Sequence, residues 1–362
     1  MSRSPSLHPL ARVEAFTARV GIRLPILLAP MAGACPPSLS IAVANAGGMG
    51  ACGAALMPPD SIASWAKNFR AQSSGQFQIN LWTPDPPPLR DAEAEKRQRE
   101  FLARWGPSVS PEMGDSVLPD FEALCRAAVA ARPKAISSIM GLFASEYVGE
   151  LKEKGILWLA TATTVEEARA AEAAGADAVI AQGMEAGGHR GAFRAEDAES
   201  HMVGLMALLP QIADAVSIPV IAAGAIADGR AVAATLILGA SAVLIGTAFL
   251  RSPEAQLNAA YAERLGRTDS HQTALTRAFT GRLARGIRNR FIDAAAAPDA
   301  PPAAPYSVQR GYTRPMREEA TRSGDTDRMQ MWAGQAARLA QAQPAAEIVQ
   351  RIWSEARQFL QS

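Results

Sequence analysis

Eight short runs of apolar and small residues, spaced between residues 26 and 246, most constrain how this chain can fold. The runs are continuous rather than alternating between apolar and polar residues, as in strands that are buried on both faces. They are Ile26–Met31, Met49–Gly53, Phe77–Leu81, Ala135–Met140, Ile156–Thr161, Ala178–Gln182, Pro219–Ala223 and Ala242–Gly246. We therefore expect eight buried strands.

Helical segments are expected between several of these strands. Thr163–Glu167 has the spacing of a capping box, and the helix after it would end near Gly175. Another helix is expected from Asp228 to Gly239. Alternating strands and helices imply a parallel sheet, and eight such units can close into a TIM (β/α)₈ barrel of the α/β class. An open, doubly wound sheet is the competing architecture, but the strand count and the alanine-rich helices favour the barrel.

Two regions do not follow the repeat. Thr83–Pro119 is rich in proline and charge, so we expect a long loop insertion at about 84–120 within a barrel that spans residues 1–250. Residues 251–362 are expected to form a C-terminal helical extension that packs on the barrel and caps the active site. Within it, Gln330–Ala342 and Ala345–Leu360 are predicted helices, and Ala294–Pro305 is a predicted flexible crossing.

Composition and charge exclude several functions. Lys plus Arg number 36 and Asp plus Glu 35, which argues against a nucleic-acid-binding protein with a basic face. No apolar run approaches the roughly 18 residues of a membrane span, and Met1–Leu10 lacks the apolar region of a signal peptide. Cys35, Cys52 and Cys125 have no metal-site spacing, so we expect buried thiols, no metal and a cytoplasmic protein.

The loops after the seventh and eighth predicted strands favour a phosphate site. Barrels commonly bind phosphate there, and Gly224 and Gly246 would let backbone N–H groups approach an anion closely. Thr247 adds a hydroxyl, and a helix that begins near Asp228 would contribute the positive end of its dipole. Taken singly, these glycines could serve only to turn the chain, but their pairing on neighbouring strands favours the phosphate site.

The loop after the sixth strand carries the residue best suited to catalysis. Gln182–Gly191 contains four glycines and His189, one of only four histidines in the chain. Imidazole can move a proton or stabilise an anion near neutral pH. A single histidine is more often structural, but its place on a glycine-rich loop at the catalytic face favours catalysis. Glu185 is a weaker candidate for a second acid or base, since it could instead pair with an arginine.

Amide side chains end two of the predicted strands. Asn80 ends the third and Gln182 the sixth, and an amide can both donate to and accept from the edge of a flavin ring. Without further context, each could equally be a polar cap of its strand. Ala29, Pro30 and Met31 close the first strand and would lie flat beneath such a ring.

A basic segment follows the predicted barrel. Ala274–Arg290 contains five arginines and no acidic residue, namely Arg277, Arg282, Arg285, Arg288 and Arg290. We expect either a solvated helix face or a positive surface that attracts an anionic substrate.

Taken together, these segments resemble the nitronate monooxygenase family, once called 2-nitropropane dioxygenases. The resemblance runs through most of the chain, and its most specific part is Gln182–His189. It is supported by Ala29–Met31, Ile79–Leu81, Ala222–Gly224, Gly246-Thr247 and the C-terminal Trp332–Gln335.

The resemblance implies an FMN-dependent enzyme that oxidises alkyl nitronates, or nitroalkanes, with O₂ to a carbonyl compound and nitrite. His189 would be catalytic, either holding the anionic nitro group or taking the α-proton of a neutral nitroalkane. The residues implied to contact FMN are Ala29, Pro30, Met31, Asn80, Gln182, Gly187, Gly188, Gly224, Gly246 and Thr247.

Some positions depart from the family pattern. Members often carry Gln where Leu244 stands. Members of the most similar class also place tyrosines and a lysine around the substrate. Here Tyr306 and Tyr312 could fill that role, with Arg310 and Arg314 in place of the lysine. The substrate pocket is therefore expected to differ.

Two other functions stay open at this point. A related flavin reductase of the enoyl-acyl-carrier-protein reductase type has the same barrel and a similar Gly-Gly-His loop, but takes hydride from NAD(P)H. A non-catalytic barrel that binds a phosphorylated ligand is the third. The expected partners are a small anionic substrate and O₂, with no nucleic acid and no membrane, and the chain is expected to be a monomer or homodimer.

Overall fold

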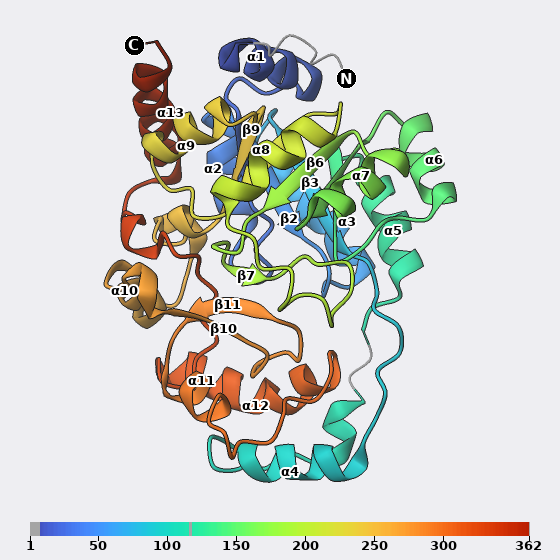
Figure 1. Cartoon of the computed structure of the whole chain (residues 1–362), viewed down its shortest axis with the longest axis vertical. Coiled ribbons are helices and arrows are strands. Elements are labelled where there is room, and N and C mark those ends of the chain that lie inside the picture. Colours follow the sequence, from blue (N-terminus) through green and yellow to red (C-terminus); the bar gives the residue numbers. More distant parts are fainter. Residues whose placement is uncertain (1–7, 116–117, 362) are drawn as a thin grey trace.

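Eight parallel strands close into a barrel at the centre of the molecule (Figure 1). The computed structural model describes residues 8–115 and 118–361, so most of the N-terminal segment Met1–Leu10 falls outside the described residues. The strands are β1 (Ile26–Leu28), β2 (Met49–Gly53), β3 (Gln76–Trp82), β4 (Ala135–Ile139), β5 (Leu157–Ala162), β6 (Ala178–Gln182), β8 (Val220–Ala223) and β9 (Ala242–Ile245). They neighbour each other in that order, and β1 pairs with β9. The predicted (β/α)₈ barrel is confirmed, and the open sheet is wrong.

The strand boundaries agree with the prediction at β2 and β6 and differ by a few residues elsewhere. The largest difference is at β1, which ends at Leu28 rather than Met31. Ala29 still donates its N–H to the Ile245 carbonyl, but Pro30 has no N–H with which to continue the ladder.

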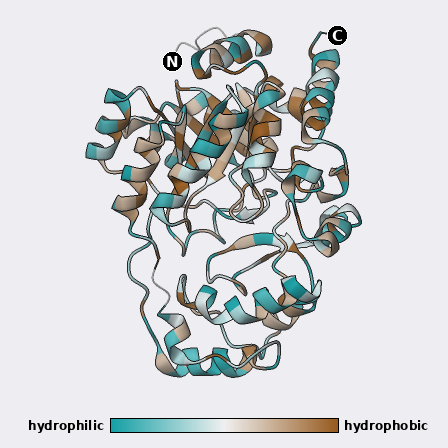
Figure 2. Ribbon diagram, turned by 180° about the vertical axis from the view of Figure 1, so that it is seen from behind, coloured by the Kyte–Doolittle hydropathy of each residue, from teal (hydrophilic) through white to brown (hydrophobic). Residues whose placement is uncertain are grey.

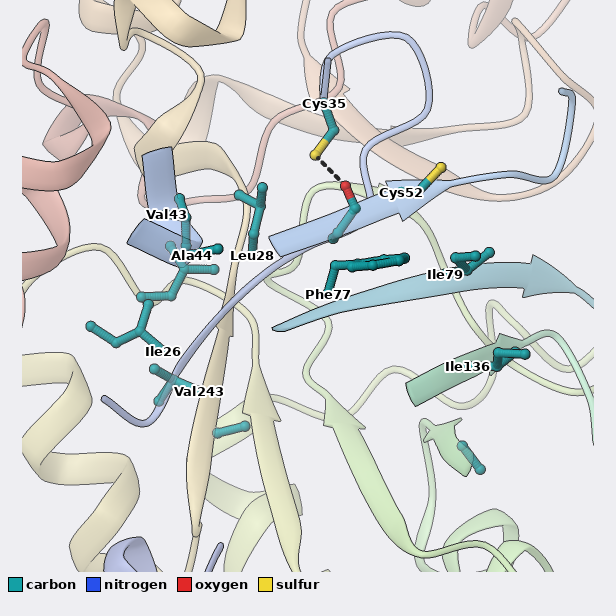
Figure 3. Close-up of a cluster of buried hydrophobic side chains, with 14 of the residues drawn as sticks. Ile26, Leu28, Cys35, Val43, Ala44, Cys52, Phe77, Ile79, Ile136 and Val243 are labelled. Carbon is teal, nitrogen blue, oxygen red and sulfur yellow. Dashed lines mark hydrogen bonds between the residues drawn. The ribbon is translucent and has the colours of Figure 1, made fainter. Parts of the chain in front are cut away.

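Helices cover the outside of the barrel. They are α2 (Pro37–Asn45), α3 (Pro59–Gln72), α5 (Phe121–Ala130), α6 (Ser145–Glu153), α7 (Val165–Ala173), α8 (Leu205–Ala215), α9 (Gly229–Ile237) and α13 (Ala345–Gln361). Figure 3 shows this layer, where Val43 and Ala44 of α2 lie near Ile26 and Leu28 of β1. Each apolar strand is thus covered on its outer face.

The predicted helix boundaries in the repeat are confirmed. Thr164 caps α7, because its hydroxyl accepts from the Glu167 N–H at 3.1 Å, while the Glu167 carboxylate reaches back to Thr163. Asp228 caps α9 in the same way. Both helices are followed by a glycine with positive φ, as predicted.

Helix α1 (Pro9–Val20) lies across one end of the barrel (Figure 1). Phe16 and Val20 of α1 pack with side chains of the barrel interior, including Leu27, Leu159 and Ile180. This end is therefore filled with apolar side chains, which leaves the opposite end for a ligand.

A second layer, here called the cap, lies over that opposite end (Figure 1). It consists of residues 83–115 and 270–332 and contains α4 (Ala92–Leu102), β10 (Thr273–Thr276), β11 (Ala284–Ile287), α11 (Arg290–Ala295), α12 (Val308–Ser323) and the 3₁₀ helices η1 (Pro111–Gly114) and η4 (Ser270–Gln272). Phe101 from the first segment packs with Phe279, Phe291 and Tyr312 from the second. Figure 2 shows hydrophilic residues along α4 and α12 and hydrophobic ones in the barrel strands. The insertion and the extension therefore form one layer with its own small core.

Short elements connect the two layers. They are β7 (Gly188–His189), α10 (Ala259–Gly266) and the 3₁₀ helices η2 (Thr247–Phe249), η3 (Pro253–Ala255) and η5 (Ala337–Leu339).

Two secondary-structure predictions in the extension are wrong, whereas the terminal helix α13 is confirmed. Gln330–Ala342 is not a helix: it runs beside β11, where Ile287 donates to the Met331 carbonyl. At its start the buried residues Met331 and Ala333 alternate with period two, which favours an extended segment, and Ala337–Leu339 forms only the short 3₁₀ helix η5. Ala274–Arg290 is not a helix face either.

That basic segment is a hairpin in which β10 and β11 pair antiparallel. Gly281, at φ +88°, allows the connecting turn. Two of the five arginines are buried rather than solvated, because Arg282 is 2% exposed and Arg285 5%. The hairpin therefore brings buried positive charge to the layer boundary.

The described part of the chain has neither a membrane-spanning helix nor a cluster of metal ligands. No helix in residues 8–115 and 118–361 is long and apolar enough to cross a membrane. The same residues contain no group of three or more His, Cys, Asp or Glu arranged to hold a metal. Cys35, Cys52 and Cys125 are buried free thiols, as predicted.

Candidate active site

The loop after β6 reaches from the barrel to the cap. Its strand β7 pairs antiparallel with β11, with His189 opposite Ala284 and Gly188 opposite Arg285. Figure 1 shows β7 between the barrel and the cap hairpin. The structure thus places His189 at the open end of the barrel, under the cap.

The His189 ring is enclosed by two indoles and one hydroxyl. Its centroid lies 4.7 Å from that of Trp82 and 5.4 Å from that of Trp332, both edge-on. Its Nε2 lies 2.9 Å from Thr280 Oγ1. Burial, with the positive charges of Arg282 and Arg310, lowers the His189 pKa to about 3. The imidazole is therefore neutral near pH 7.

Gln182 holds the loop that carries His189. Its Nε2 donates to the His189 carbonyl at 3.0 Å, and its Oε1 accepts from the Gly191 N–H at 2.8 Å. Asn80, at the end of β3, donates from Nδ2 to the Ser137 hydroxyl at 3.0 Å. Both amides thus make bonds within the protein, and their contacts with a flavin stay predictions.

Glu185 has a structural bond that occupies its carboxylate. Both of its oxygens accept from the Leu205 N–H, at 2.9 and 3.1 Å, at the start of α8. A carboxylate is stabilised there by the free N–H groups and the dipole of the helix. Nearby, Arg285 donates to the Met184 carbonyl. These bonds favour a structural role for Glu185 over the acid or base role considered from the sequence.

The glycine turns after β8 and β9 lie side by side, because Ala223 pairs with Leu244 just before them. Within the described part of the chain, no acceptor is found for the backbone N–H groups of Gly224, Ala225, Gly246 and Thr247. These four residues are partly exposed. Buried or half-buried N–H groups without partners favour an anionic ligand at this point.

The predicted contribution of the α9 dipole is wrong. The Asp228 carboxylate accepts from the Ala231 N–H at 3.0 Å, and Glu355 of α13 accepts from the Gly229 N–H at 3.1 Å. Two carboxylates thus already occupy the start of α9. Among the free N–H groups of the turns, that of Thr247 belongs instead to the first residue of η2.

The end of β1 lies against the second glycine turn. A Cβ on Gly246 would stand 3.1 Å from Met31 Sδ and 3.2 Å from Ala29 Cβ, so a larger residue there would press on the end of β1. Thr247 Oγ1 accepts from the Gly334 N–H at 3.0 Å. A side chain on Gly187 would collide with the Gly334 backbone. The Trp332–Gln335 signature therefore packs on the predicted ligand loops.

The two tyrosines considered for the substrate pocket lie in different places. Tyr306 packs against Trp82, with centroids 5.7 Å apart, and so joins the His189 surroundings. Tyr312 is only 1% exposed, and its hydroxyl donates to Glu95 at 2.7 Å within the cap core. Tyr312 is therefore a structural residue.

Sequence reasoning missed Trp82, Thr280 and the pairing of Arg282 with Asp85 near His189. Trp82 ends β3, so its position at the mouth could have been inferred from its place after Asn80. Thr280 and the ion pair of Arg282 with Asp85 had no sequence signal, because the residues they contact lie about 90 to 200 positions away.

A hollow of about 1150 Å³ lies elsewhere, between α4 and the segment after α11. It is lined by charged residues of both signs, such as Arg104 and Asp299, and by none of the predicted site residues. We therefore place the candidate site at the barrel mouth.

Comparison with known proteins agrees with this geometry. The family model described as nitronate monooxygenase matches residues 14–355. A nitronate monooxygenase of Pseudomonas aeruginosa is 39% identical over 349 residues, 95% of this chain and 99% of the relative. One from Paraburkholderia phytofirmans is 38% identical over 349 residues, 94% of each chain. The solved nitroalkane oxidase from Streptomyces ansochromogenes is 37% identical, with a TM-score of 0.85 over 95% of this chain and 98% of that chain. The chain therefore belongs to the nitronate monooxygenase family, whose members are oxidoreductases.

Proposed function

We propose that this chain is an FMN-dependent enzyme that oxidises alkyl nitronates, or nitroalkanes, with O₂ to a carbonyl compound and nitrite. The observation that carries the proposal is the neutral imidazole of His189 at the barrel mouth, beside glycine turns with free N–H groups. The names of the relatives support the substrate class.

The residues around the mouth fit FMN. The N–H groups of Gly224, Ala225, Gly246 and Thr247 would receive the phosphate. Ala29, Pro30 and Met31 would lie beneath the ring, and Gly187 and Gly188 leave space beside it. Asn80 and Gln182 would contact its polar edge. When bound, FMN supplies a two-electron acceptor that is reoxidised by O₂.

The protein residues would bind the substrate and handle its proton. Neutral His189 can take the α-proton of a nitroalkane, and once protonated it can hold the nitronate anion. Trp82, Trp332 and Tyr306 would exclude water from one side of the ring. Arg310 adds positive charge that favours an anion.

The first test is the visible spectrum of the purified protein, followed by oxygen uptake with added nitronate. We expect a flavin spectrum, and uptake accompanied by nitrite release. A colourless protein that cannot be reconstituted with FMN would contradict the cofactor. Rapid bleaching of the flavin by NADH without oxygen, with no nitronate-dependent uptake, would favour the reductase instead.

A further inference from the structure

Two hydrogen bonds link the His189 ring to the cap hairpin through Thr280. Thr280 Oγ1 lies 2.9 Å from His189 Nε2 and 3.2 Å from the Arg282 carbonyl oxygen. A carbonyl oxygen can only accept, and a threonine hydroxyl has one proton to donate. Within the described residues, Thr280 is the sole hydrogen-bond donor to this buried carbonyl.

We infer that Thr280 fixes His189 in the neutral tautomer that carries its proton on Nε2, so that Nδ1 presents its lone pair to the substrate. In this arrangement His189 donates to Thr280, and Thr280 donates to Arg282. The Nε2–H group, the Thr280 hydroxyl and the Arg282 carbonyl then each have a hydrogen-bond partner. In the other tautomer Thr280 would have to donate to Nε2, and the Arg282 carbonyl would be left unpaired, which is rare for buried carbonyls.

The second ring nitrogen is open to a ligand. Within residues 8–115 and 118–361, His189 Nδ1 has no hydrogen-bond partner. Some polar side-chain atoms that lack a partner are fully buried, but Nδ1 does not belong to that group. Nδ1 is therefore accessible, whereas Nε2 is bonded to Thr280.

The charges around the ring keep Nδ1 unprotonated. Arg282 of the hairpin and Arg310 of α12 face His189, and both oppose a second proton. Asp85 pairs with Arg282, and Tyr306 lies near the same arginines. The residues contributed by β3 and by the segment after α12, Trp82 and Trp332, are uncharged.

Thr280 is thus a positioning residue, and its effect on turnover depends on the proposed function. With a neutral nitroalkane, the α-C–H bond breaks and an N–H bond forms at Nδ1. The electron pair stays on the substrate as the nitronate, whose negative charge then faces the imidazolium. A proton on Nδ1 at the outset would prevent this transfer.

The tautomer can be tested without substrate, by ¹⁵N NMR of the histidine-labelled FMN-bound protein at pH 7. The His189 signals are those that disappear in His189→Asn. We expect the Nε2–H pattern in the parent and in Thr280→Ser, and a mixture or the Nδ1–H form in Thr280→Val. Thr276→Val is the matched control, because Thr276 lies in the same hairpin and its hydroxyl, within the described residues, accepts only from the Ala278 N–H. A parent protein with the proton on Nδ1 would overturn the inference.

Measurements of turnover provide a second test of the positioning role. Thr280→Val should lower kcat for a neutral nitroalkane by roughly tenfold, less than the 10² to 10⁴-fold that general-base catalysis supplies in total, and lower kcat for the preformed nitronate less. Thr280→Ser should recover most of the loss. Equal losses with both substrates would contradict the positioning role. If the tautomer is found but neither substrate reacts, the proposed function fails and the tautomer assignment stands.

Discussion

The barrel and the cap are built in different ways. Each barrel strand up to β6 pairs with the next strand along the chain, so that assembly proceeds through neighbours in sequence. The cap joins segments far apart in the chain: Glu95 bonds Tyr312, and Trp105 packs against Phe291. The ligand turns come from the barrel, whereas much of the wall around His189 comes from the cap. Sequence repeats therefore reveal the first part of the site more readily than the second.

The largest expected effect is at His189, where barrel and cap meet. His189→Asn should reduce kcat for a neutral nitroalkane by about 10² to 10⁴-fold, because it removes the proposed general base. The flavin spectrum should be retained, since the turns proposed to bind the FMN phosphate belong to the barrel. Steady-state oxygen uptake measures kcat, and visible absorbance measures how much flavin the variant retains. His271→Asn, at an exposed residue of η4, is the control and should match the parent. Parental turnover in His189→Asn would show that His189 is not the general base.

The second prediction tests the buried ion pair of Arg282 with Asp85, which joins the two segments of the cap. Arg282 is 2% exposed and makes a bidentate pair with Asp85, at 2.6 and 2.8 Å. Asp85→Asn leaves that guanidinium without its carboxylate, so the free energy of unfolding should fall by about 3–5 kcal/mol. Urea unfolding followed by tryptophan fluorescence measures it.

A matched surface pair provides the control for that variant. Asp293→Asn breaks the exposed pair with Arg288 and should cost no more than about 1 kcal/mol. Equal losses of unfolding free energy in the two variants would mean that the buried ion pair does not hold the cap together.

A third prediction concerns the barrel turns alone. Gly224 has φ +130°, and its N–H has no acceptor within the described residues. Gly224→Val should weaken FMN binding by about tenfold or more, or roughly 1.4 kcal/mol, because the side chain strains the turn and blocks the anion. Fluorescence titration of the apoprotein with FMN measures it.

Gly175 is the matched control at the other end of the barrel. It also has positive φ, +95°, and a Cβ there would come close only to the flexible end of Lys152, with Val148 Cγ1 in ordinary contact at 3.5 Å. Gly175→Val should lower stability but leave FMN affinity unchanged. If both variants lose FMN equally, the effect is general strain and not a phosphate site.

The smallest effect is a change in the pH response of His189. Its pKa is lowered to about 3 from an ordinary 6.5, so protonation of the unfolded chain costs stability as the pH falls from 6.5 towards 3. Arg310→Gln removes one of the opposing charges, so the pKa should rise and less stability should be lost on acidification. An NMR pH titration of His189 checks the direction. A pKa that stays at the parental value would mean that Arg310 does not act on the ring.

Much of the site's barrel side could be predicted from the sequence. Gly224, Gly246 and His189 follow buried strands, and the closed barrel brings strand ends to one face. The dipole of α9 could not be assigned correctly, because Glu355, which occupies its N-terminus, lies 126 residues further along the chain. Similarly, nothing in the spacing of Tyr312 shows that Glu95 binds its hydroxyl in the cap core.

The sequence by itself determined the eight strands and the barrel, since burial on both faces and glycine stops are local patterns that each segment carries. Only the tertiary structure decided that the basic segment 274–290 is a hairpin and that Thr280 contacts His189. The physical reason is that hydrogen bonds between distant segments depend on how the layers pack, and local periodicity does not encode that packing.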